Sequence, residues 1–495
     1  MTAAASAVLG VDVGTASSKG VLVALDGTIL RSTVREHTVQ RPAPGHVEMD
    51  AEIWWSEFLS IAQELTAPGD VVVTAVGVSG MGPCALLTDE RGTPVRPAIL
   101  YGVDTRAEAQ IRRLTNELGK EEVLAHCGAL LTSQSAGPKI TWVAENEPEV
   151  YARARRVFMP ASYLAFRLTG EYVMDHVSAG KSPPLYSLRR QDWHREWADR
   201  AAPQLELPRL RRPGEAAGTV SAEITAQVPG LPTGIPVISG TIDAWTEAAS
   251  VGATRPGDLM LMYGTTTFLV ATTDEPLASR TMWPTSGLAE GTYTLSGGMA
   301  TSGAITDWLR ELTGEDGFTD LVAEAQRSEP GANGLVMLPY FSGERSPMAD
   351  PSARGVVAGL TLSHTRGDLY RAALEAAAYG VRHHLETLEA AGLSLQRVTA
   401  VGGGARHDLW PQIVSDVTGL SQQIPRSTVG ASYGGARLAA ELAHGTDTSG
   451  WNPVDHRCVP DPAHRERYDE LYRLYRELYP ATREITHSLA ALQRG

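Results

Sequence analysis

Residues 8–23 read Val-Leu-Gly-Val-Asp-Val-Gly-Thr-Ala-Ser-Ser-Lys-Gly-Val-Leu-Val. Two β-rich runs, 8–13 and 20–25, flank the turn at Gly14 and Thr15, so this stretch predicts a β-hairpin. Residues 259–271 read Leu-Met-Leu-Met-Tyr-Gly-Thr-Thr-Thr-Phe-Leu-Val-Ala, which is again strand, Gly-Thr turn and strand. The two copies open the two halves of the chain and indicate a weak internal repeat, although chance also produces such pairs.

The rest of the chain alternates between helix-like and strand-like segments, which predicts an α/β fold. Asp50 opens an amphipathic helix, and residues 71–78 form an apolar run typical of a buried strand. Thr365 and Asp368 have the spacing of a capping box at the start of a later helix. A further helix follows the triple glycine near residue 402 and ends at Gly419.

The bulk properties exclude several classes of protein. The net charge of -14 argues against nucleic acid as the main partner, because phosphate backbones require a basic surface. The three cysteines have neither disulfide nor zinc spacing, which favours a reducing compartment. Residues 1–10 lack signal-peptide features, and no apolar run reaches the ~18 residues of a membrane span. We therefore expect a cytoplasmic protein with no membrane or nucleic-acid partner.

The first hairpin has the residue types of a phosphate-binding loop. Gly14 lets the backbone approach a phosphate, and Thr15, Ser17 and Lys19 offer donors to its oxygens. The carboxylate of Asp12 can hold a magnesium ion, often through water. An ordinary hairpin turn with a surface aspartate is the alternative, and the local sequence leaves the two equally open.

Two other segments carry candidate site residues. Gly402, Gly403 and Gly404 lie between a strand at 398–401 and a helix starting near Asp408, which favours close packing of a flat or anionic ligand over a structural turn. Asp243 follows the apolar run 235–238, where a loop carboxylate can face a cleft. It could equally be the N-cap of a helix over residues 244–249.

Two apparent motifs carry little weight. Gly80, Gly82 and Ala85 have the spacing of a dinucleotide fingerprint, but the residues after them indicate a short strand and turn instead of the required helix. His383 and His384 are adjacent on a predicted helix and point in different directions, so a metal site there is improbable.

Taken together, these segments resemble the FGGY family of carbohydrate kinases, in its xylulokinase-like branch and in the actin-like ATPase superfamily. The resemblance runs from Val8 to about Gly445. Residues 12–19 match the family's first phosphate loop and residues 263–267 its second. Residues 139–146 match the second half of one family signature, and residues 355–375 match the other along its whole length.

The resemblance implies an α/β protein with two ribonuclease-H-like (actin-like ATPase) domains around a central cleft. The N-terminal domain, residues 1–246, would bind the sugar and carry the first phosphate loop and the base. The C-terminal domain, residues 247–495, would bind the nucleotide. The loop-like, Pro/Gly-rich stretch 203–236 would then lie inside the first domain.

The family's roles also transfer to particular residues. Asp243 falls at the catalytic base and Asp12 at the magnesium position, so ATP and Mg²⁺ are the implied cofactors. Met81, Gly82 and Asp104 fall at the sugar site together with Asp243. The implied nucleotide contacts are Thr15, Ser17, Lys19, Gly264, Thr265, Gly303, Asp307, Gly402, Gly403, Gly404 and Asp408.

The implied activity is ATP-dependent phosphorylation of a primary hydroxyl on a ketose, such as xylulose or ribulose, or on a related polyol. Two departures affect the sugar end: Gly82 stands where xylulose kinases of the family carry a histidine, and Gly102 stands where the family often has a tryptophan. We therefore expect room for a bulkier group at Gly82 and a best substrate other than D-xylulose.

Two alternatives on the same fold stay open. One is a catalytically silent, sugar-responsive regulator, which the presence of Asp12 and Asp243 disfavours. The other is a chaperone or filament ATPase, which the signature at 355–375 disfavours. The resemblance also leaves a homodimer open.

Overall fold

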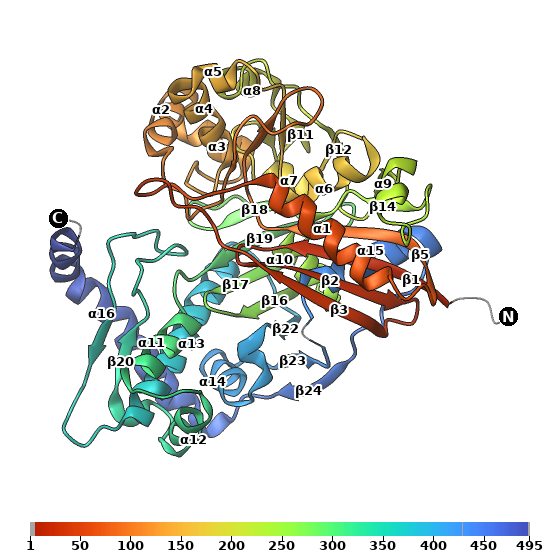
Figure 1. The fold of residues 1–495 in the computed structure, drawn as a ribbon. Helices are drawn as coiled ribbons and strands as arrows, with labels where there is room; N and C mark the ends of the chain where they lie inside the picture. The colour runs from red at the N-terminus through yellow and green to blue at the C-terminus, as the bar shows by residue number, and fades with distance from the viewer. Residues whose placement is uncertain (1–4, 428, 494–495) are drawn as a thin grey trace. The chain divides into compact units, whose positions relative to one another are not determined.

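A computed structural model describes residues 5–427 and 429–493, and its contacts divide the chain into two compact units (Figure 1). Unit 1 holds residues 5–256, 272–294 and 429–453, and unit 2 holds residues 257–271, 295–427 and 454–493. The structure thus differs from the expected division at residue 246. The first long segment runs on to Pro256, and two later segments return to unit 1, because helix α15 (Ala431–His444) packs on the sheet of that unit.

The sheet of unit 1 has the order β13-β14-β5-β1-β2-β3, and β15 also pairs with β5. The predicted hairpin is confirmed: β1 and β2 are antiparallel, and Asp12 pairs with Lys19 across them. Strands β1, β14 and β15 run parallel to β5. The strands are β1 (Ala5–Val13), β2 (Ser17–Ala24), β3 (Ile29–Glu36), β5 (Val71–Gly80), β13 (Ala216–Thr219), β14 (Pro236–Ile238) and β15 (Thr241–Ile242).

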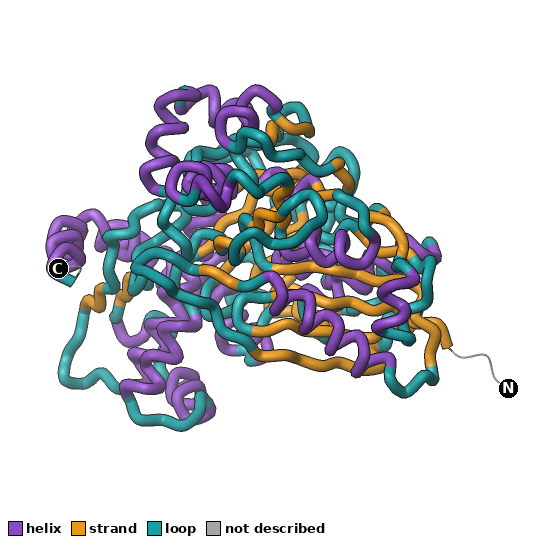
Figure 2. The backbone as a smooth tube through the Cα atoms, turned by 45° about the horizontal axis from the view of Figure 1, so that its top comes forward, coloured by secondary structure: helices purple, strands orange, loops and turns teal. Residues whose placement is uncertain are grey.

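Two helices cover opposite faces of this sheet, and the alternation of side chains along β1 decides which residue meets which helix. Leu9 and Val11 join the core that contains helix α1 (Ala51–Thr66), whose N-cap is Asp50 as predicted. Val8 points the other way and packs with residues of α15. Figures 1 and 2 show the strands of this sheet lying side by side with helices against them.

Helix α15 lies unusually close to its neighbours, because glycines remove the side chains between them. A Cβ atom at Gly10 or Gly77 would collide with the backbone of α15, at Ser432 and Gly435 respectively. A Cβ atom at Gly434 would collide with the carbonyl oxygen of Thr246 on helix α10 (Asp243–Ser250). These contacts hold α15 against both the sheet and α10, at a separation that only glycine permits.

Unit 2 repeats the arrangement of the first hairpin. Its sheet contains strands in the order β19-β17-β16-β22-β23-β24, with β16 antiparallel to β17 and parallel to β22. In unit 1, β1 is likewise antiparallel to β2 and parallel to β5, so the predicted internal repeat is present in the structure. The strands are β16 (Asp258–Tyr263), β17 (Thr267–Thr273), β19 (Tyr293–Gly298), β22 (Arg397–Val401), β23 (Gln422–Pro425) and β24 (Val454–Cys458).

The helices of unit 2 confirm two local predictions. Helix α13 (Arg366–Ala390) starts with the predicted capping box between Thr365 and Asp368, and α14 (Leu409–Thr418) ends at Gly419 in the left-handed conformation. The other helices of this unit are α11 (Gly303–Leu312), α12 (Thr319–Arg327) and α16 (Arg465–Leu492), with short 3-10 turns at Ala332–Gly334, Gly403–Arg406 and Pro462–His464.

The middle of unit 1 is built from short elements. Its stretch 203–236 is less loop-like than predicted, because it contains strands and a helix as well as turns. The remaining helices of the unit are α2 (Glu108–Leu118), α3 (Lys120–Cys127), α4 (Ala136–Asn146), α5 (Pro148–Tyr151), α6 (Pro160–Thr169), α7 (His176–Gly180), α8 (Arg195–Ala201) and α9 (Ala222–Gln227). Its remaining strands are β4 (Glu48–Met49), β6 (Leu86–Thr88), β7 (Ala98–Ile99), β8 (Arg156–Phe158), β9 (Val173–Asp175), β10 (Tyr186–Ser187), β11 (Asp192–Trp193), β12 (Arg209–Arg211) and β18 (Trp283–Ser286). Short β20 (Val336–Leu338) and β21 (Val356–Ala358) belong to unit 2.

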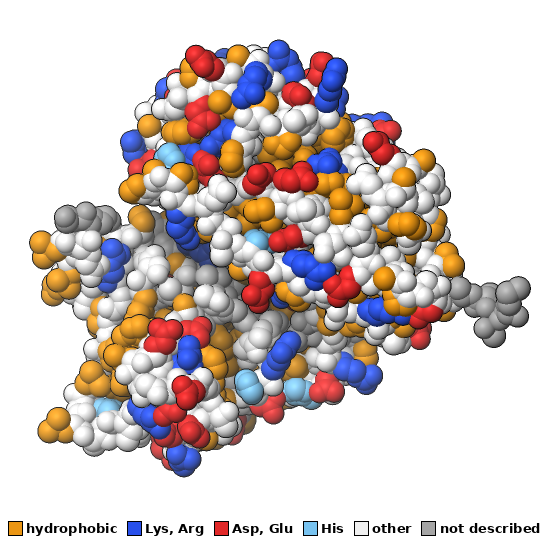
Figure 3. All heavy atoms as spheres, in the orientation of Figure 1, with side chains coloured by type: hydrophobic (Ala, Val, Ile, Leu, Met, Phe, Trp, Pro, Cys, Tyr) orange, Lys and Arg blue, Asp and Glu red, His pale blue; other side chains and the backbone are white. Residues whose placement is uncertain are grey.

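Surface features agree with the composition. Basic and acidic side chains lie interspersed over the face seen in Figure 3. Among the described residues, no helix is both long enough and apolar enough to cross a membrane. Cys84, Cys127 and Cys458 are all buried and free, which agrees with their scattered spacing.

The contact between α15 and α10 gives the first prediction. Gly434→Ala should destabilise the protein by about 1–3 kcal/mol, the usual cost of overpacking, because the new methyl group meets the Thr246 carbonyl. Thermal unfolding of the purified variant measures this. Gly450→Ala is the matched control, since a Cβ atom there meets nothing within 4 Å. Equal melting temperatures for both variants would contradict the account.

Candidate active site

Three strands of unit 1 end together and bring candidate residues to one edge of the sheet. Val13 on β1 and Ile242 on β15 both pair with Gly80, the last residue of β5. Because these strands are parallel, Asp12, Met81 and Asp243 come to the same carboxyl edge. In open α/β sheets this edge is where ligands bind.

Asp12 lies on β1, and its Oδ1 accepts a hydrogen bond from Ser79 Oγ at 2.8 Å. Burial raises the pKa of Asp12, while Ser79 and the positive charge of Lys19 lower it in part. A raised pKa means that the folded protein does not supply enough positive charge to balance this carboxylate. The carboxylate is therefore suited to a cation that arrives with a ligand.

Asp243 is the first residue of α10 and follows β15 directly. It is not the N-cap, which is Ile242, although its Oδ1 accepts a hydrogen bond from Ala244 N at 2.7 Å. Burial raises the pKa of Asp243, and the negative charges of Asp12 and Glu247 raise it further. A carboxylate with a raised pKa is a stronger proton acceptor than one in water, which suits a general base.

Thr15 connects the first hairpin to the predicted sugar-binding segment. Its hydroxyl lies 3.0 Å from the Tyr101 hydroxyl and 3.7 Å from the Met81 sulfur. Met81 is buried, and its backbone N–H donates to the Val13 carbonyl at 2.7 Å. Ser17 closes the turn, because its carbonyl accepts a hydrogen bond from Gly14 N. Lys19 pairs with Asp12 across the hairpin, and its side chain is exposed. Thr15 and Met81 are thus brought together.

The carboxylate of Asp104, a predicted sugar contact, is already bound by other residues of the protein. It is fully buried; its Oδ2 accepts from Val47 N at 2.6 Å and pairs with Arg106 Nη2 at 2.7 Å. Its Oδ1 accepts from Arg106 N and Nε. These contacts do not support the predicted contact with substrate, and they favour a role in holding the loop at 101–106.

At Gly82 and Gly102, the two departures from the family pattern, the adjacent space is filled by other side chains. A Cβ atom at Gly82 would lie 2.7 Å from Ile242 Cγ1, and one at Gly102 would collide with the side chain of Gln134. The expectation of room for a bulkier group at Gly82 is therefore wrong. Gln134 stands beside the position where the family often has a tryptophan, and the sequence alone gave no signal for this contact.

Two further buried residues lie at this edge. Lys139 Nζ donates to the carbonyls of Tyr101 and Ser133 at 2.9 and 2.5 Å, and burial lowers its pKa to about 8. Burial raises the pKa of Cys84 to about 12; the charge of Lys139 lowers it in part, and the charge of Asp243 raises it. Lys139 therefore joins the loops that carry Tyr101 and Ser133, which gives a physical reason for its place in the family signature.

Unit 2 contains a pocket of about 480 Å³, a size typical of small-molecule sites. The predicted nucleotide residues that line it are Gly264, Thr265, Gly303, Asp307, Gly403 and Gly404. The amide of Gly303 donates to the Gly264 carbonyl, and the amide of Ala304 donates to the Thr265 carbonyl. The start of α11 thus holds the second Gly-Thr turn at one end of the pocket.

The three consecutive glycines have different roles. A Cβ atom at Gly402 would lie 2.5 Å from the Tyr263 carbonyl oxygen, and its φ of +91° also favours glycine. A Cβ atom at Gly404 would lie 2.6 Å from the ring of Trp410. At Gly403 a Cβ atom meets nothing within 4 Å, and the residue lines the pocket. Gly402 is thus a packing residue, and Gly403 is the glycine that leaves space for a ligand.

Asp408, another predicted nucleotide contact, lies outside the lining of this pocket. Its side chain is 81% exposed and pairs with His456 Nε2 at 3.2 Å. Its neighbours His407 and Leu409 do line the pocket. The lining residues that sequence reasoning missed are Tyr263, Thr306, Phe318, Val322, Tyr370, Leu374, His407, Leu409 and Trp410. Most are apolar or aromatic, which suits the flat face of a nucleotide base.

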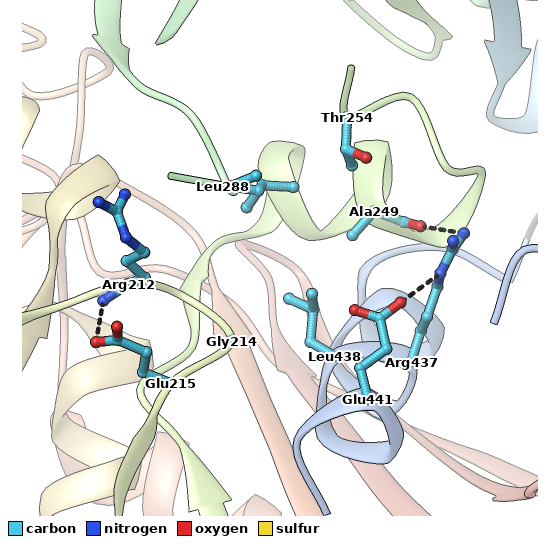
Figure 4. A pocket seen from close by; sticks show the side chains of 10 residues that line it. Arg212, Gly214, Glu215, Ala249, Thr254, Leu288, Arg437, Leu438 and Glu441 are labelled. Carbon is cyan, nitrogen blue, oxygen red and sulfur yellow. Dashed lines mark hydrogen bonds and ion pairs between the residues drawn. The ribbon is translucent and has the colours of Figure 1, made fainter. Parts of the chain in front are cut away.

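A second pocket, of about 280 Å³, lies in unit 1 away from the predicted site residues (Figure 4). The four charged residues that line it are held by the protein. Glu215 accepts from Arg212 N, Arg212 pairs with Glu290, and Arg437 contacts both Glu441 and the Ala249 carbonyl. A ligand there would have to break these pairs, so this pocket is not the candidate site.

Comparison with known proteins also divides the chain into two parts. The profile of the FGGY family of carbohydrate kinases, N-terminal domain, matches residues 7–252, and that of the C-terminal domain matches residues 259–443. The xylulose kinase of Escherichia coli K12 is 31% identical over 95% of this chain and 99% of its own. The glycerol kinase 2 of Streptomyces avermitilis is 30% identical over 90% of each chain. The crystal structure of a xylulose kinase from Rhodospirillum rubrum superposes with a TM-score of 0.89, at 33% identity over 97% of this chain and all of that one.

Gly403 gives the second prediction. Gly403→Val should raise the KM for ATP by about 5- to 150-fold, because a steric cost of about 1–3 kcal/mol in the pocket corresponds to that factor. The KM for the second substrate should not change, since the residues predicted to bind that substrate lie in unit 1. Steady-state kinetics with each substrate varied in turn measure both values, and Gly403→Ala should show a smaller effect. An unchanged KM for ATP would show that the nucleotide does not use the open space at Gly403.

Proposed function

This chain belongs to the FGGY family of carbohydrate kinases, and from that premise we propose that it transfers the γ-phosphoryl group of ATP to a primary hydroxyl of a pentulose. The observation that carries the proposal is Asp243, a half-buried carboxylate with a raised pKa at the carboxyl edge of the sheet. The glycine-lined pocket of unit 2 supports it, because its shape and lining suit ATP.

In this reaction Asp243 accepts the proton of the substrate hydroxyl. The hydroxyl oxygen forms a bond to the γ-phosphorus as the bond from that phosphorus to the bridging oxygen breaks, and ADP leaves. Thr15 and Lys19 would donate to phosphate oxygens from unit 1, and the turn at Gly264 and Thr265 would donate from unit 2. Negative charge that develops during transfer is thereby spread over several donors.

Kinases of this family use ATP and typically a divalent metal, and the residues at Asp12 fit Mg²⁺. The carboxylates beside it are all hard oxygen donors, which Mg²⁺ prefers. Asp12 would hold the ion, directly or through water. The ion would neutralise phosphate charge during transfer.

A pentulose is the proposed substrate class, and D-xylulose is the first candidate, which replaces the expectation of a different best substrate. Two of the relatives described above are xylulose kinases, and one is a glycerol kinase. Ile242 and Gln134 occupy the space beside Gly82 and Gly102, so these two departures from the family pattern do not require a larger sugar. The missing histidine still removes a polar partner, which predicts weaker binding of D-xylulose than in relatives that retain it.

The silent-regulator alternative has no observation in its favour. Asp12, Thr15 and Asp243 lie together at one edge, and the second Gly-Thr turn is intact at its pocket. We place the protein in the cytoplasm because its cysteines are free and buried. Assembly as a homodimer stays a prediction.

Asp243→Asn gives the third prediction. Turnover should fall by about 10²–10⁴-fold, the usual contribution of a positioned acid–base group, because an amide cannot accept the proton. Binding of ATP, measured by calorimetry, should stay within about twofold, since the pocket lies in unit 2. Near-normal turnover in this variant would show that Asp243 is not the base.

The substrate class gives the fourth prediction. A coupled ADP-release assay across D-xylulose, D-ribulose, D-fructose, ribitol and glycerol should give a pentulose the highest kcat/KM. A missing hydrogen bond between a buried group and a substrate hydroxyl typically costs about 1–3 kcal/mol, so non-pentuloses should be about 5- to 150-fold poorer. A tenfold preference for glycerol or ribitol over both pentuloses would contradict the proposal. Gly82→His is a poor test of the missing histidine, because its Cβ atom meets Ile242.

A further inference from the structure

Glu247 is a buried carboxylate that the family resemblance does not assign. It lies four residues after Asp243 on α10, so the two side chains project from the same face of the helix. Its exposed fraction is 8%, and no described residue donates a hydrogen bond to its carboxylate or forms an ion pair with it. Burying a carboxylate without a partner is costly, and such groups occur where function requires them.

The packing of α15 shows which end of the sheet Glu247 approaches. His444 at the end of α15 contacts Thr74 early in β5, with 2.8 Å between their polar atoms. Near the start of α15, Gly435 lies against Gly77, later in β5. The helix therefore runs antiparallel to β5 and β1, and its N-terminus lies at their carboxyl edge.

Asp12 and Glu247 approach this N-terminus from two sides. Gly10 touches Ser432 of α15, and Asp12 lies two residues further along β1, so its side chain is on the same face of the sheet as Gly10. On the other side, a Cβ atom at Gly430 would lie 2.8 Å from Glu247 Oε2. Burial raises the pKa of Glu247, the negative charge of Asp12 raises it further, and the positive charge of Lys19 lowers it in part; the two charge effects agree with the proximity of these residues.

We propose that Glu247 acts with Asp12 as a second protein carboxylate for the divalent cation that enters with ATP. Asp12, Asp243 and Glu247 place three carboxylates at one edge, and among the described residues Lys19 is the cation whose charge lowers the pKa of Asp12 and of Glu247. Among the described residues, no three ligand side chains lie close enough to hold a metal unaided. The phosphate oxygens of ATP must therefore complete the site, as is common for Mg²⁺.

A structural role is the competing explanation. A carboxylate at a helix N-terminus stabilises the helix through the helix dipole, and Glu247 lies at the N-terminus of α15. In that case the variant Glu247→Gln would change thermal stability and leave metal affinity as it is. The two roles thus predict different metal affinities for Glu247→Gln, and metal affinity can be measured without enzymatic turnover.

The experiment measures Mn²⁺ binding by electron paramagnetic resonance on the full-length protein with a non-hydrolysable ATP analogue. Glu247→Gln should weaken Mn²⁺ binding by about 10-fold or more, a loss typical of removing a supporting ligand. Glu223→Gln, on the exposed first turn of α9, is the matched control and should bind as wild type. Wild-type Mn²⁺ affinity in Glu247→Gln would overturn the proposal, whatever its melting temperature.

Two further readouts keep the test decisive. If Glu247→Gln fails to fold, Glu247→Asp, which keeps the charge on a shorter side chain, should still weaken Mn²⁺ binding by about threefold or more, and unchanged affinity would overturn the proposal.

The inference rests on the proposed function. A wild-type protein that shows neither phosphorylation nor ATP-dependent Mn²⁺ binding would refute that function. A wild type that shows both, with unaltered Mn²⁺ binding in Glu247→Gln, would refute only the role of Glu247.

Discussion

The site in unit 1 depends on the close backbone contact of α15 with the sheet and with α10. Glycines at Gly10, Gly77 and Gly434 let these backbones approach to a distance that any side chain would prevent. The contact with the sheet fixes the N-terminus of α15 at the carboxyl edge. The contact with α10 fixes the helix whose first residue is Asp243, so the position of the proposed base follows from the absence of three side chains.

The two units contribute different physical properties to the reaction. Unit 1 gathers Asp12, Asp243 and Glu247 where burial raises their pKa values, a destabilising arrangement that a cation and a proton-donating substrate would relieve. Unit 2 offers a largely apolar pocket with glycine turns at one end, which suits a base and a phosphate chain. The proposed phosphoryl-transfer residues and the proposed nucleotide pocket thus belong to different units, although both units contain a Gly-Thr hairpin.

Features that depend on neighbours in sequence could be predicted. The hairpin at Gly14, the capping box at Thr365 and the helix end at Gly419 are set by local geometry, and all three are present. Contacts between distant segments could not be predicted. Ile242 fills the space beside Gly82, and the backbone amide of Val47 donates a hydrogen bond to the carboxylate of Asp104. Both contacts join residues that are far apart in sequence. The aromatic lining of the proposed nucleotide pocket likewise comes from several segments of the chain and has no linear motif.

Phosphoryl transfer to a sugar can be followed directly by ³¹P nuclear magnetic resonance of the purified protein with ATP, Mg²⁺ and D-xylulose. We expect the ATP signals to decline as those of ADP and a phosphomonoester grow in equal amounts. The phosphomonoester signal should be split by the two protons of a CH₂–O–P group, and it should be absent without the sugar. Release of inorganic phosphate alone, at the same rate with and without D-xylulose or D-ribulose, would contradict the account.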